Sequence, residues 1–459
     1  MEQITKPHCG ARLDRLPDCR WHSSMFAIVA FGLLVCWSNA VGGLILAQLK
    51  ALGWTDNSTT ATFSAITTAG MFLGALVGGI IGDKTGRRNA FILYEAIHIA
   101  SMVVGAFSPN MDFLIACRFV MGVGLGALLV TLFAGFTEYM PGRNRGTWSS
   151  RVSFIGNWSY PLCSLIAMGL TPLISAEWNW RVQLLIPAIL SLIATALAWR
   201  YFPESPRWLE SRGRYKEAEK VMRSIEEGVI RQTGKPLPPV VIADDGKAPQ
   251  AVPYSALLTG VLLKRVILGS CVLIAMNVVQ YTLINWLPTI FMTQGINLKD
   301  SIVLNTMSMF GAPFGIFIAM LVMDKIPRKT MGVGLLILIA VLGYIYSLQT
   351  SMLLITLIGF FLITFVYMYV CYASAVYVPE IWPTEAKLRG SGLANAVGRI
   401  SGIAAPYAVA VLLSSYGVTG VFILLGAVSI IVAIAIATIG IETKGVSVES
   451  LSIDAVANK

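Results

Sequence analysis

The most constraining feature of this chain is a series of long apolar stretches that recurs from one end to the other. Each stretch is about 20 residues long, the length of helix that crosses a ~30 Å hydrocarbon layer. Only 13% of the 459 residues are charged, which is about half of the supply in soluble proteins. We therefore predict an all-α polytopic membrane protein with twelve transmembrane helices in two pseudo-symmetric six-helix bundles. The predicted spans are 25–49, 60–82, 90–108, 113–136, 147–171, 181–201, 264–290, 301–323, 331–349, 352–377, 391–413 and 419–440.

The positive charges predict the orientation of these spans. With the N-terminus placed inside, 29 of the 34 Lys and Arg residues fall on the inner side, 3 on the outer side and 2 within spans. Because positively charged loops remain in the cytoplasm, we expect both termini to be cytoplasmic. The short loops are typical of bacteria, so we expect a multi-pass protein of the cell inner membrane. The same inner loops account for the net charge of +10 without a nucleic-acid partner.

The longest connection divides the spans six and six. Its first part, from Glu204 to Glu227, has an apolar side and predicts an amphipathic helix capped by Ser205. Its second part is rich in proline and predicts a flexible tether. The predicted regions are an N-terminal tail at 1–24, a bundle at 25–201, a loop at 202–263, a second bundle at 264–440 and a tail at 441–459.

Short charged motifs recur in the two halves at matching spacing. Asp83-Lys-Thr-Gly-Arg-Arg follows the second span, and Asp324-Lys-Ile-Pro-Arg-Lys follows the eighth. Glu138 lies 55 residues after Asp83, and Glu380 lies 56 residues after Asp324. This spacing indicates two homologous bundles. Parallel repeats of this kind place a substrate site at the bundle interface, near the membrane midplane.

These motifs resemble those of the major facilitator superfamily, and of its sugar-porter and metabolite:proton symporter branch. The resemblance covers essentially the whole chain and implies a secondary transporter that works by alternating access, is a monomer and uses the proton as its coupling ion. The motifs that carry it are Gly79-Ile-Ile-Gly-Asp-Lys-Thr-Gly-Arg-Arg88, Arg118 with the glycines after it, Trp180-Arg181, Pro203-Glu-Ser-Pro-Arg-Trp-Leu and Glu442-Thr-Lys-Gly445.

The resemblance also implies a gating role for the charged motifs. Asp83 beside two arginines would latch one conformation, and the pairs Glu138–Arg145 and Glu380–Arg389 would form inner gates. The expected gating residues are Gly79, Asp83, Gly86, Arg87, Arg88, Glu138, Arg145, Asp324, Arg328, Glu380 and Arg389.

The first span departs from the proton-coupled pattern. Members of the branch carry an acidic residue there, facing an arginine in the fourth span; Arg118 is present, but Ser38 stands at the acidic position. A hydroxyl does not release a proton near neutral pH, so either the protein is a passive facilitator or the proton site has moved. Glu95 and His98, three residues apart on one helix face, are the candidate relay. The alternative is that Glu95, only about five residues from the inner end, reaches back to the surface or pairs with a gate arginine.

The substrate positions of the branch are altered too. Amides and guanidinium groups within the spans are candidates for substrate binding, although each amide could equally join helices. Arg399, near the midplane, suits a carboxylate. The leading substrate class is a sugar, sugar alcohol or sugar acid, and the alternative is an organic carboxylate. The candidate binding residues are Asn39, Arg118, Asn157, Asn277, Gln280, Asn285 and Arg399, and the aromatic candidates for ring stacking are Trp158, Tyr160, Tyr281, Trp286, Tyr367 and Tyr372.

Other classes of protein fit less well. An enzyme would need a catalytic constellation, and the chain has three histidines and no nucleophile-with-base spacing. No phosphate-binding loop for ATP is present, and neither a metal site nor a cofactor is expected. A non-transporting membrane sensor is the least favoured reading. The expected partners are a small-molecule substrate and the lipid bilayer.

Overall fold

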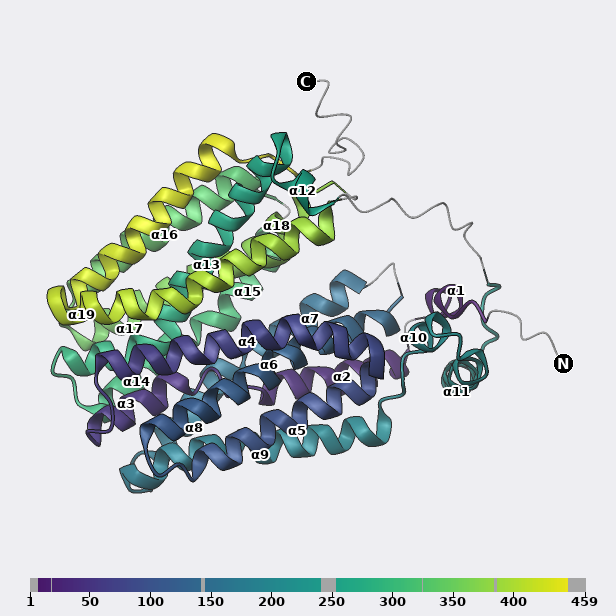
Figure 1. The fold of residues 1–459 in the computed structure, drawn as a ribbon, viewed down its shortest axis with the longest axis horizontal. Coiled ribbons are helices and arrows are strands. Elements are labelled where there is room, and N and C mark those ends of the chain that lie inside the picture. The colour runs from purple at the N-terminus through teal and green to yellow at the C-terminus, as the bar shows by residue number, and fades with distance from the viewer. Residues whose placement is uncertain are drawn as a thin grey trace. The chain divides into compact units, whose positions relative to one another are not determined.

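The computed structural model describes residues 7–17, 19–141, 145–240, 253–323, 325–383 and 386–444, with the side chains of all of these except 134, 137, 145, 146, 387 and 388. Every regular element in these ranges is a helix (Figure 1). The first half contains α1 (Cys9–Asp14), α2 (Arg20–Val35), α3 (Gly42–Ala51), α4 (Asn57–Thr85), α5 (Arg87–Ala106), α6 (Met111–Tyr139), α7 (Arg145–Asn157), α8 (Ser159–Leu170) and α9 (Ala176–Tyr201). The connection and second half contain α10 (Pro206–Ser211), α11 (Tyr215–Thr233), α12 (Tyr254–Leu257), α13 (Gly260–Thr293), α14 (Leu298–Met309), α15 (Gly311–Val322), α16 (Arg328–Ser347), α17 (Met352–Cys371), the π-helix η1 (Tyr372–Tyr377), α18 (Val378–Glu380) and α19 (Lys387–Ile439).

The predicted all-α polytopic fold is confirmed. In the described part of the chain, nine helical stretches are long and apolar enough to cross a membrane. One of these, α19, holds the last two predicted spans, and the pairs α2/α3 and α7/α8 supply the first and fifth. The nine stretches and these two pairs lie at the positions of the predicted spans.

Several predicted spans are not the single straight helices that their hydropathy indicates. The first is interrupted at 36–41, between α2 and α3, and the fifth at Trp158, between α7 and α8. The last two spans are continuous in α19 except at Gly417, whose φ of 65° is non-helical. Glycine adopts positive φ without a Cβ clash, so it can turn the chain there.

Contacts between residues divide the chain into two compact units. Unit one comprises 1–39, 70–159 and 184–246, and unit two comprises 40–69, 160–183 and 247–459. The chain leaves unit one within the interrupted part of the first span and again beside the interruption of the fifth.

Unit one is built around helices that pack through small and aromatic residues. Helix α5 lies against α6, and α2 lies against α7. A Cβ atom at Gly124 of α6 would lie only 3.0 Å from the backbone nitrogen of His98. Glycine therefore lets α5 approach α6 closely at the level of His98.

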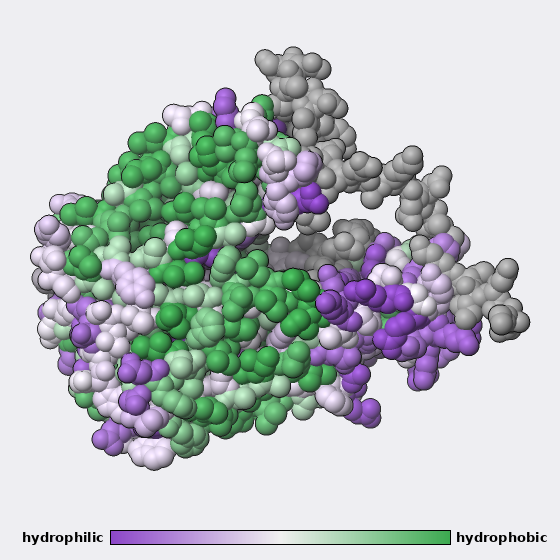
Figure 2. Space-filling view, in the orientation of Figure 1, coloured by the Kyte–Doolittle hydropathy of each residue, from purple (hydrophilic) through white to green (hydrophobic). Residues whose placement is uncertain are grey.

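The 202–263 connection begins with two helices rather than one. Ser205 caps α10 as predicted, accepting a hydrogen bond from the Trp208 backbone nitrogen at 3.2 Å. Helix α11 follows, and the short helix α1 of the N-terminal segment packs on both (Figure 1). Figure 2 shows hydrophilic residues gathered over α1, α10 and α11, whereas apolar residues cover the membrane-spanning helices.

Unit two is organised around α13 and α19, which pack along much of their length. A Cβ atom at Gly398 would lie 3.0 Å from Nδ2 of Asn277, and one at Gly402 would lie 3.1 Å from the Tyr281 ring. Two glycines one turn apart on α19 thus face two polar residues one turn apart on α13. We call this contact line the α13–α19 seam.

Candidate functional site

A chain of buried polar groups lies where the first span is interrupted. The Ser38 hydroxyl and Nε2 of His98 are 2.7 Å apart, a hydrogen-bond distance. Nη1 of Arg118 donates to the Ser38 carbonyl oxygen at 2.7 Å. Ser38 therefore joins an imidazole to a guanidinium through two of its atoms, and all three side chains are buried.

Glu95 extends this chain by one turn of α5. Its Oε2 lies 3.4 Å from Nδ1 of His98. Its Oε1 is buried and has no hydrogen-bond partner among the residues that the structure describes. The side chain is fully buried, so Glu95 does not reach back to the surface. The two candidate relay residues and Arg118 thus form one cluster, joined by Ser38.

The local sequence explains this geometry. Ser and Asn side chains compete with the backbone for hydrogen bonds and so favour turns over helix interiors. Ser38 and Asn39 lie in the interruption between α2 and α3. Because Ser38 is outside a helix, its carbonyl oxygen is available to Arg118 rather than to the backbone.

A second cluster of charges surrounds Arg87 at the start of α5. Its Nε donates to Oε1 of Glu138 at 2.8 Å, and its Nη1 donates to Oδ1 of Asp83 at 2.7 Å. The other Glu138 oxygen accepts from the Ser205 hydroxyl. One arginine thereby connects α4, α5 and α6 to the residue that caps α10.

Glu204 holds the N-terminus of α5. Its Oε1 accepts from the backbone nitrogens of Arg87 at 2.7 Å and of Arg88 at 3.2 Å. A carboxylate is favourable there because helix N-termini carry partial positive charge. Gly86 has a φ of 99°, and a Cβ atom on it would lie 2.3 Å from Glu204 Oε2. Only glycine fits this position.

Unit two contains the same arrangement. Arg328 donates to both oxygens of Glu380, at 3.0 and 3.1 Å. Glu442 accepts from the backbone nitrogens of Arg328 at 2.8 Å and of Lys329 at 3.1 Å. The Thr443 hydroxyl donates to Glu380 at 2.6 Å. Each unit therefore has an arginine, a paired glutamate, a helix-capping glutamate and a hydroxyl in corresponding places, which we call the Arg87 network and the Arg328 network.

Sequence reasoning missed half of the residues in these networks. The signal was present, because Glu204-Ser205 and Glu442-Thr443 each follow the last long helix of their half. A tyrosine closes each network as well: the Tyr139 hydroxyl lies 2.6 Å from the Pro203 carbonyl oxygen, and the Tyr377 hydroxyl lies 3.1 Å from that of Ile441.

The environment of Glu442 keeps it ionised. Burial raises the pKa of this carboxyl, but hydrogen bonds from the backbone nitrogens of Arg328, Lys329 and Lys444 outweigh that effect. The pKa of Glu442 therefore lies below its ordinary value. At neutral pH, Glu442 is therefore a carboxylate that caps the N-terminus of α16.

Several expected gating residues lie elsewhere. Asp324 lies outside the described residues, and so does the side chain of Arg145. Arg389 lies 5.2 Å from the centre of the Tyr254 ring. Nη2 of Arg88 donates to the Trp199 carbonyl oxygen, and Gly79 has no atom within 4 Å of a built Cβ. In the described residues, the arginine paired with Glu138 is Arg87 and the one paired with Glu380 is Arg328.

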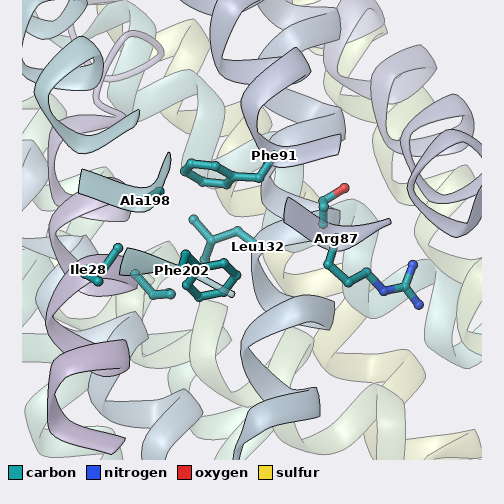
Figure 3. Close-up of a pocket in the computed structure, with 8 residues that line it drawn as sticks. Ile28, Arg87, Phe91, Leu132, Ala198 and Phe202 are labelled. Carbon is teal, nitrogen blue, oxygen red and sulfur yellow. The ribbon is translucent and has the colours of Figure 1, made fainter. Parts of the chain in front are cut away.

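A small apolar hollow lies behind Arg87. Figure 3 shows Phe91, Leu132 and Phe202 facing one another, with Ile28 and Ala198 beside them. The Arg87 guanidinium extends away from these side chains. Apart from Arg87 and Thr131, the residues that line the hollow are apolar, so we assign it to packing beneath the Arg87 network.

The candidate amides differ in their hydrogen bonds and in their burial. Nδ2 of Asn157 donates to the Ser153 carbonyl oxygen at 2.8 Å, and Nδ2 of Asn277 donates to that of Leu273 at 2.7 Å. Both amides therefore satisfy their own helices in part. Asn39 is half-buried in the interruption of the first span, Gln280 is half-buried in α13, and Asn285 is buried where α13 meets α3.

The features described so far define a class: a helical polytopic membrane protein with buried ionisable groups inside one unit and a repeated charge network in both. The sequence model of the Major Facilitator Superfamily matches residues 25–406, and the chain belongs to this family. It is 44% identical to the inner membrane metabolite transport protein YdjE of Escherichia coli over 98% of this chain and 99% of that protein. It is also 26% identical to the niacin transporter NiaP of Acinetobacter baylyi, over 96% of this chain and 99% of that protein.

Solved structures agree on the fold. The xylose transporter XylE of Escherichia coli, in a partially occluded inward-open conformation, matches with a TM-score of 0.73 over 93% of this chain and 100% of that one, at 18% identity. Its membership of the Major Facilitator Superfamily makes the protein a membrane transporter of small molecules rather than an enzyme.

Proposed function

We propose that this protein is a proton-coupled symporter that carries a small polar metabolite across the bacterial inner membrane by alternating access, with both termini in the cytoplasm. The observation that carries the proposal is the buried chain Glu95–His98–Ser38, which Arg118 joins at the Ser38 carbonyl. Ionisable groups inside a membrane span are costly and mark function by default.

The chemistry of this chain suits proton transfer. Imidazole is the side chain whose ordinary titration range lies around neutral pH, and it can pass a proton between its two nitrogens. In this cluster, one His98 nitrogen lies near a carboxylate and the other lies near a hydroxyl. His98 would thus carry the proton at the place where Ser38 stands instead of an acid, with Glu95 as its partner.

The two charge networks support alternating access. Each consists of polar contacts between the ends of three or more helices, so a movement of those helices relative to one another would break several of these contacts. We propose that the Arg87 and Arg328 networks hold their units in one conformation and are released in the other.

Two classes of substrate fit the sequence motifs and the charged residues. The loop motifs favour a sugar, sugar alcohol or sugar acid, and the similarity to the xylose transporter fold is consistent with that. Arg399 favours the second candidate, an organic carboxylate, because a cation within a span needs an anionic partner. Similarity to a niacin transporter is consistent with this second class.

The test is proton entry into liposomes that contain the purified full chain and a trapped pH-sensitive dye. Xylose, inositol, galacturonate and benzoate are added in turn. We expect at least one of them to drive proton entry, and we expect His98→Ala and Glu95→Gln to reduce that entry to background. His8→Ala, which removes a histidine of the N-terminal segment, is the matched control and retains it.

The same liposomes separate coupling from transport. Exchange of labelled solute across the membrane needs no net proton movement, so it persists in His98→Ala if that side chain only couples. Solute uptake without proton entry in the unaltered protein would instead identify a passive facilitator and overturn the proposal.

A further inference from the structure

We propose that unit two holds a recognition site for a ring-bearing monocarboxylate, with Arg399 as the group that binds the carboxylate and a cluster of three tyrosines as the walls that take the ring. The proposal rests on the transporter function proposed above and names its substrate class.

The tyrosines come from three different helices of unit two. Tyr160 of α8 and Tyr367 of α17 meet edge to face, with ring centroids 5.3 Å apart. Tyr281 and Gln280 of α13 lie beside both phenol groups. Tyr367 is buried, whereas Tyr160, Gln280 and Tyr281 are half-buried. Aromatic walls of this kind take a flat or puckered ring by stacking, and phenol and amide groups supply hydrogen bonds.

The α13–α19 seam links Arg399 to this cluster through the backbone of α19. Gly402 contacts the Tyr281 ring, and Gly398 contacts the Asn277 amide. Arg399 follows Gly398 directly, so its backbone lies within one turn of the residue that touches Tyr281. The seam packs tightly because both α19 positions are glycine.

Arg399 is an incompletely satisfied cation within a span. Its Nη1 is buried and has no hydrogen-bond partner in the described part of the chain. Arginine remains protonated at any physiological pH, and its planar fork matches a carboxylate through two parallel hydrogen bonds. An anionic substrate would supply the partner that this nitrogen lacks.

The same set of side chains is poorly suited to a neutral substrate with many hydroxyl groups. Such ligands need several amides that both donate and accept. Asn277, one turn before Tyr281 on α13, already donates to the Leu273 carbonyl oxygen. Gln280 is the amide that lies among the tyrosines. One guanidinium, three phenols and one amide suit a ring with a single carboxylate.

Two kinds of metabolite share this chemistry, a sugar acid in its ring form and an aromatic acid. The experiment therefore uses two matched pairs, each with an anion and its neutral counterpart. Galacturonate is compared with galactose, and benzoate is compared with benzamide. Binding to the purified full chain is measured by calorimetry at constant pH without a membrane gradient, so the result does not depend on proton coupling.

We expect the acid of one pair to bind at least about 10-fold more tightly than its neutral partner, as a charge-assisted hydrogen bond of 1.5–3 kcal/mol implies. Which pair shows this preference identifies a sugar acid or an aromatic acid. In Arg399→Gln the preference disappears, whereas the matched charge removal Lys299→Gln, at an exposed position, leaves it unchanged. Arg399→Lys retains the charge but loses the fork, and it should bind the acid with intermediate affinity.

A folding defect is excluded by thermal unfolding of the same variants. Because Arg399→Gln removes a half-buried cation whose Nη1 lacks a partner, we expect the melting temperature to stay the same or to rise. Equal affinity for acid and neutral partner, an unchanged preference in Arg399→Gln, or binding of neither acid would each overturn this proposal. None of these results would affect the coupling role of His98, which is tested by proton entry.

Discussion

Individual residues in this protein are constrained by the backbone as much as by their side chains. Gly86 shows this most clearly, because its φ is positive and the space where a Cβ would stand is occupied by Glu204. The glutamate can cap α5 only because that space is open. Sequence reasoning singled out Gly86 from a motif, but the capping glutamate comes from a residue 118 positions away.

Gly86→Ala should destabilise the protein by about 1–3 kcal/mol, which is the usual cost of a strained backbone position, and should slow transport. The measurements are thermal unfolding and labelled-solute exchange in liposomes. Gly79→Ala is the matched control: it lies in the same loop motif but in open space, inside α4, where alanine is the better helix former. Equal effects of the two substitutions would contradict this account of Gly86.

The paired glutamates Glu138 and Glu380 should have equivalent roles. Changing either to Gln removes the charge from the contact with its arginine while it preserves the shape. We expect each substitution to cost about 1–3 kcal/mol, as for hydrogen bonds to charged groups, and to alter exchange rates in the same direction. Glu217→Gln, on an exposed pair with Arg214, should change neither stability nor exchange by a measurable amount. Opposite effects of Glu138→Gln and Glu380→Gln on the exchange rate would argue against equivalent networks.

At the scale of elements, the N-terminal segment is the least expected finding. The sequence predicts only a polar tail there, yet α1 packs on α10 and α11. Leu13 and Leu16 are buried in that contact, and the apolar residues are too few in the sequence to signal a helix. Arg12 donates to Glu226 at 2.7 and 3.0 Å and also contacts Glu219, and Arg15 donates to Glu226 at 2.6 Å.

These ion pairs make the docking of α1 sensitive to pH. Burial raises the pKa of Glu226, but hydrogen bonds from Arg12 and Arg15 outweigh burial and hold that pKa below its ordinary value of 4.5. The pairing therefore contributes its full stability above about pH 4.5 and loses it as the pH falls through the lower pKa of the folded state. We expect hydrogen exchange of residues 9–16, corrected for intrinsic rates, to show protection at neutral pH and loss of protection in acid.

Substitution gives the same prediction at constant pH. Glu226→Gln should release α1 at neutral pH, and its neighbour Glu227→Gln, which is exposed, should not. Protection of residues 9–16 that is equal in both variants would show that the apolar contacts of Leu13 and Leu16 hold α1 without the charges.

Hydropathy and motif spacing predicted most of the membrane helices, but they did not predict where the helices are interrupted. The apolar spans follow from local patterns of about 20 residues, and the repeat of charged motifs follows from their matching spacing in the two halves. The interruption at Ser38 was not predicted, because the apolar pattern indicates one span over 25–49, and the hydrogen bond from Arg118 to the Ser38 carbonyl oxygen is visible only in the structure. The tyrosine cluster is similar: Tyr160, Tyr281 and Tyr367 lie far apart in the sequence, and only packing brings them together.

At the scale of the whole molecule, unit one carries the Arg87 network and unit two carries the Arg328 network. Unit one holds the proposed proton site, and unit two holds the proposed carboxylate site. The family resemblance leads one to expect an acidic residue in the first span, where this chain has Ser38. We propose that proton coupling depends instead on His98, which contacts Ser38. Transport driven by a proton gradient should then depend on a residue of the third span.

The most direct test of this claim is accumulation of a labelled substrate in liposomes under an imposed inward proton gradient. The account predicts accumulation above the external concentration in the unaltered protein and in His8→Ala, and only equilibration in His98→Ala, with solute exchange retained. Accumulation by His98→Ala equal to that of the unaltered protein would contradict it.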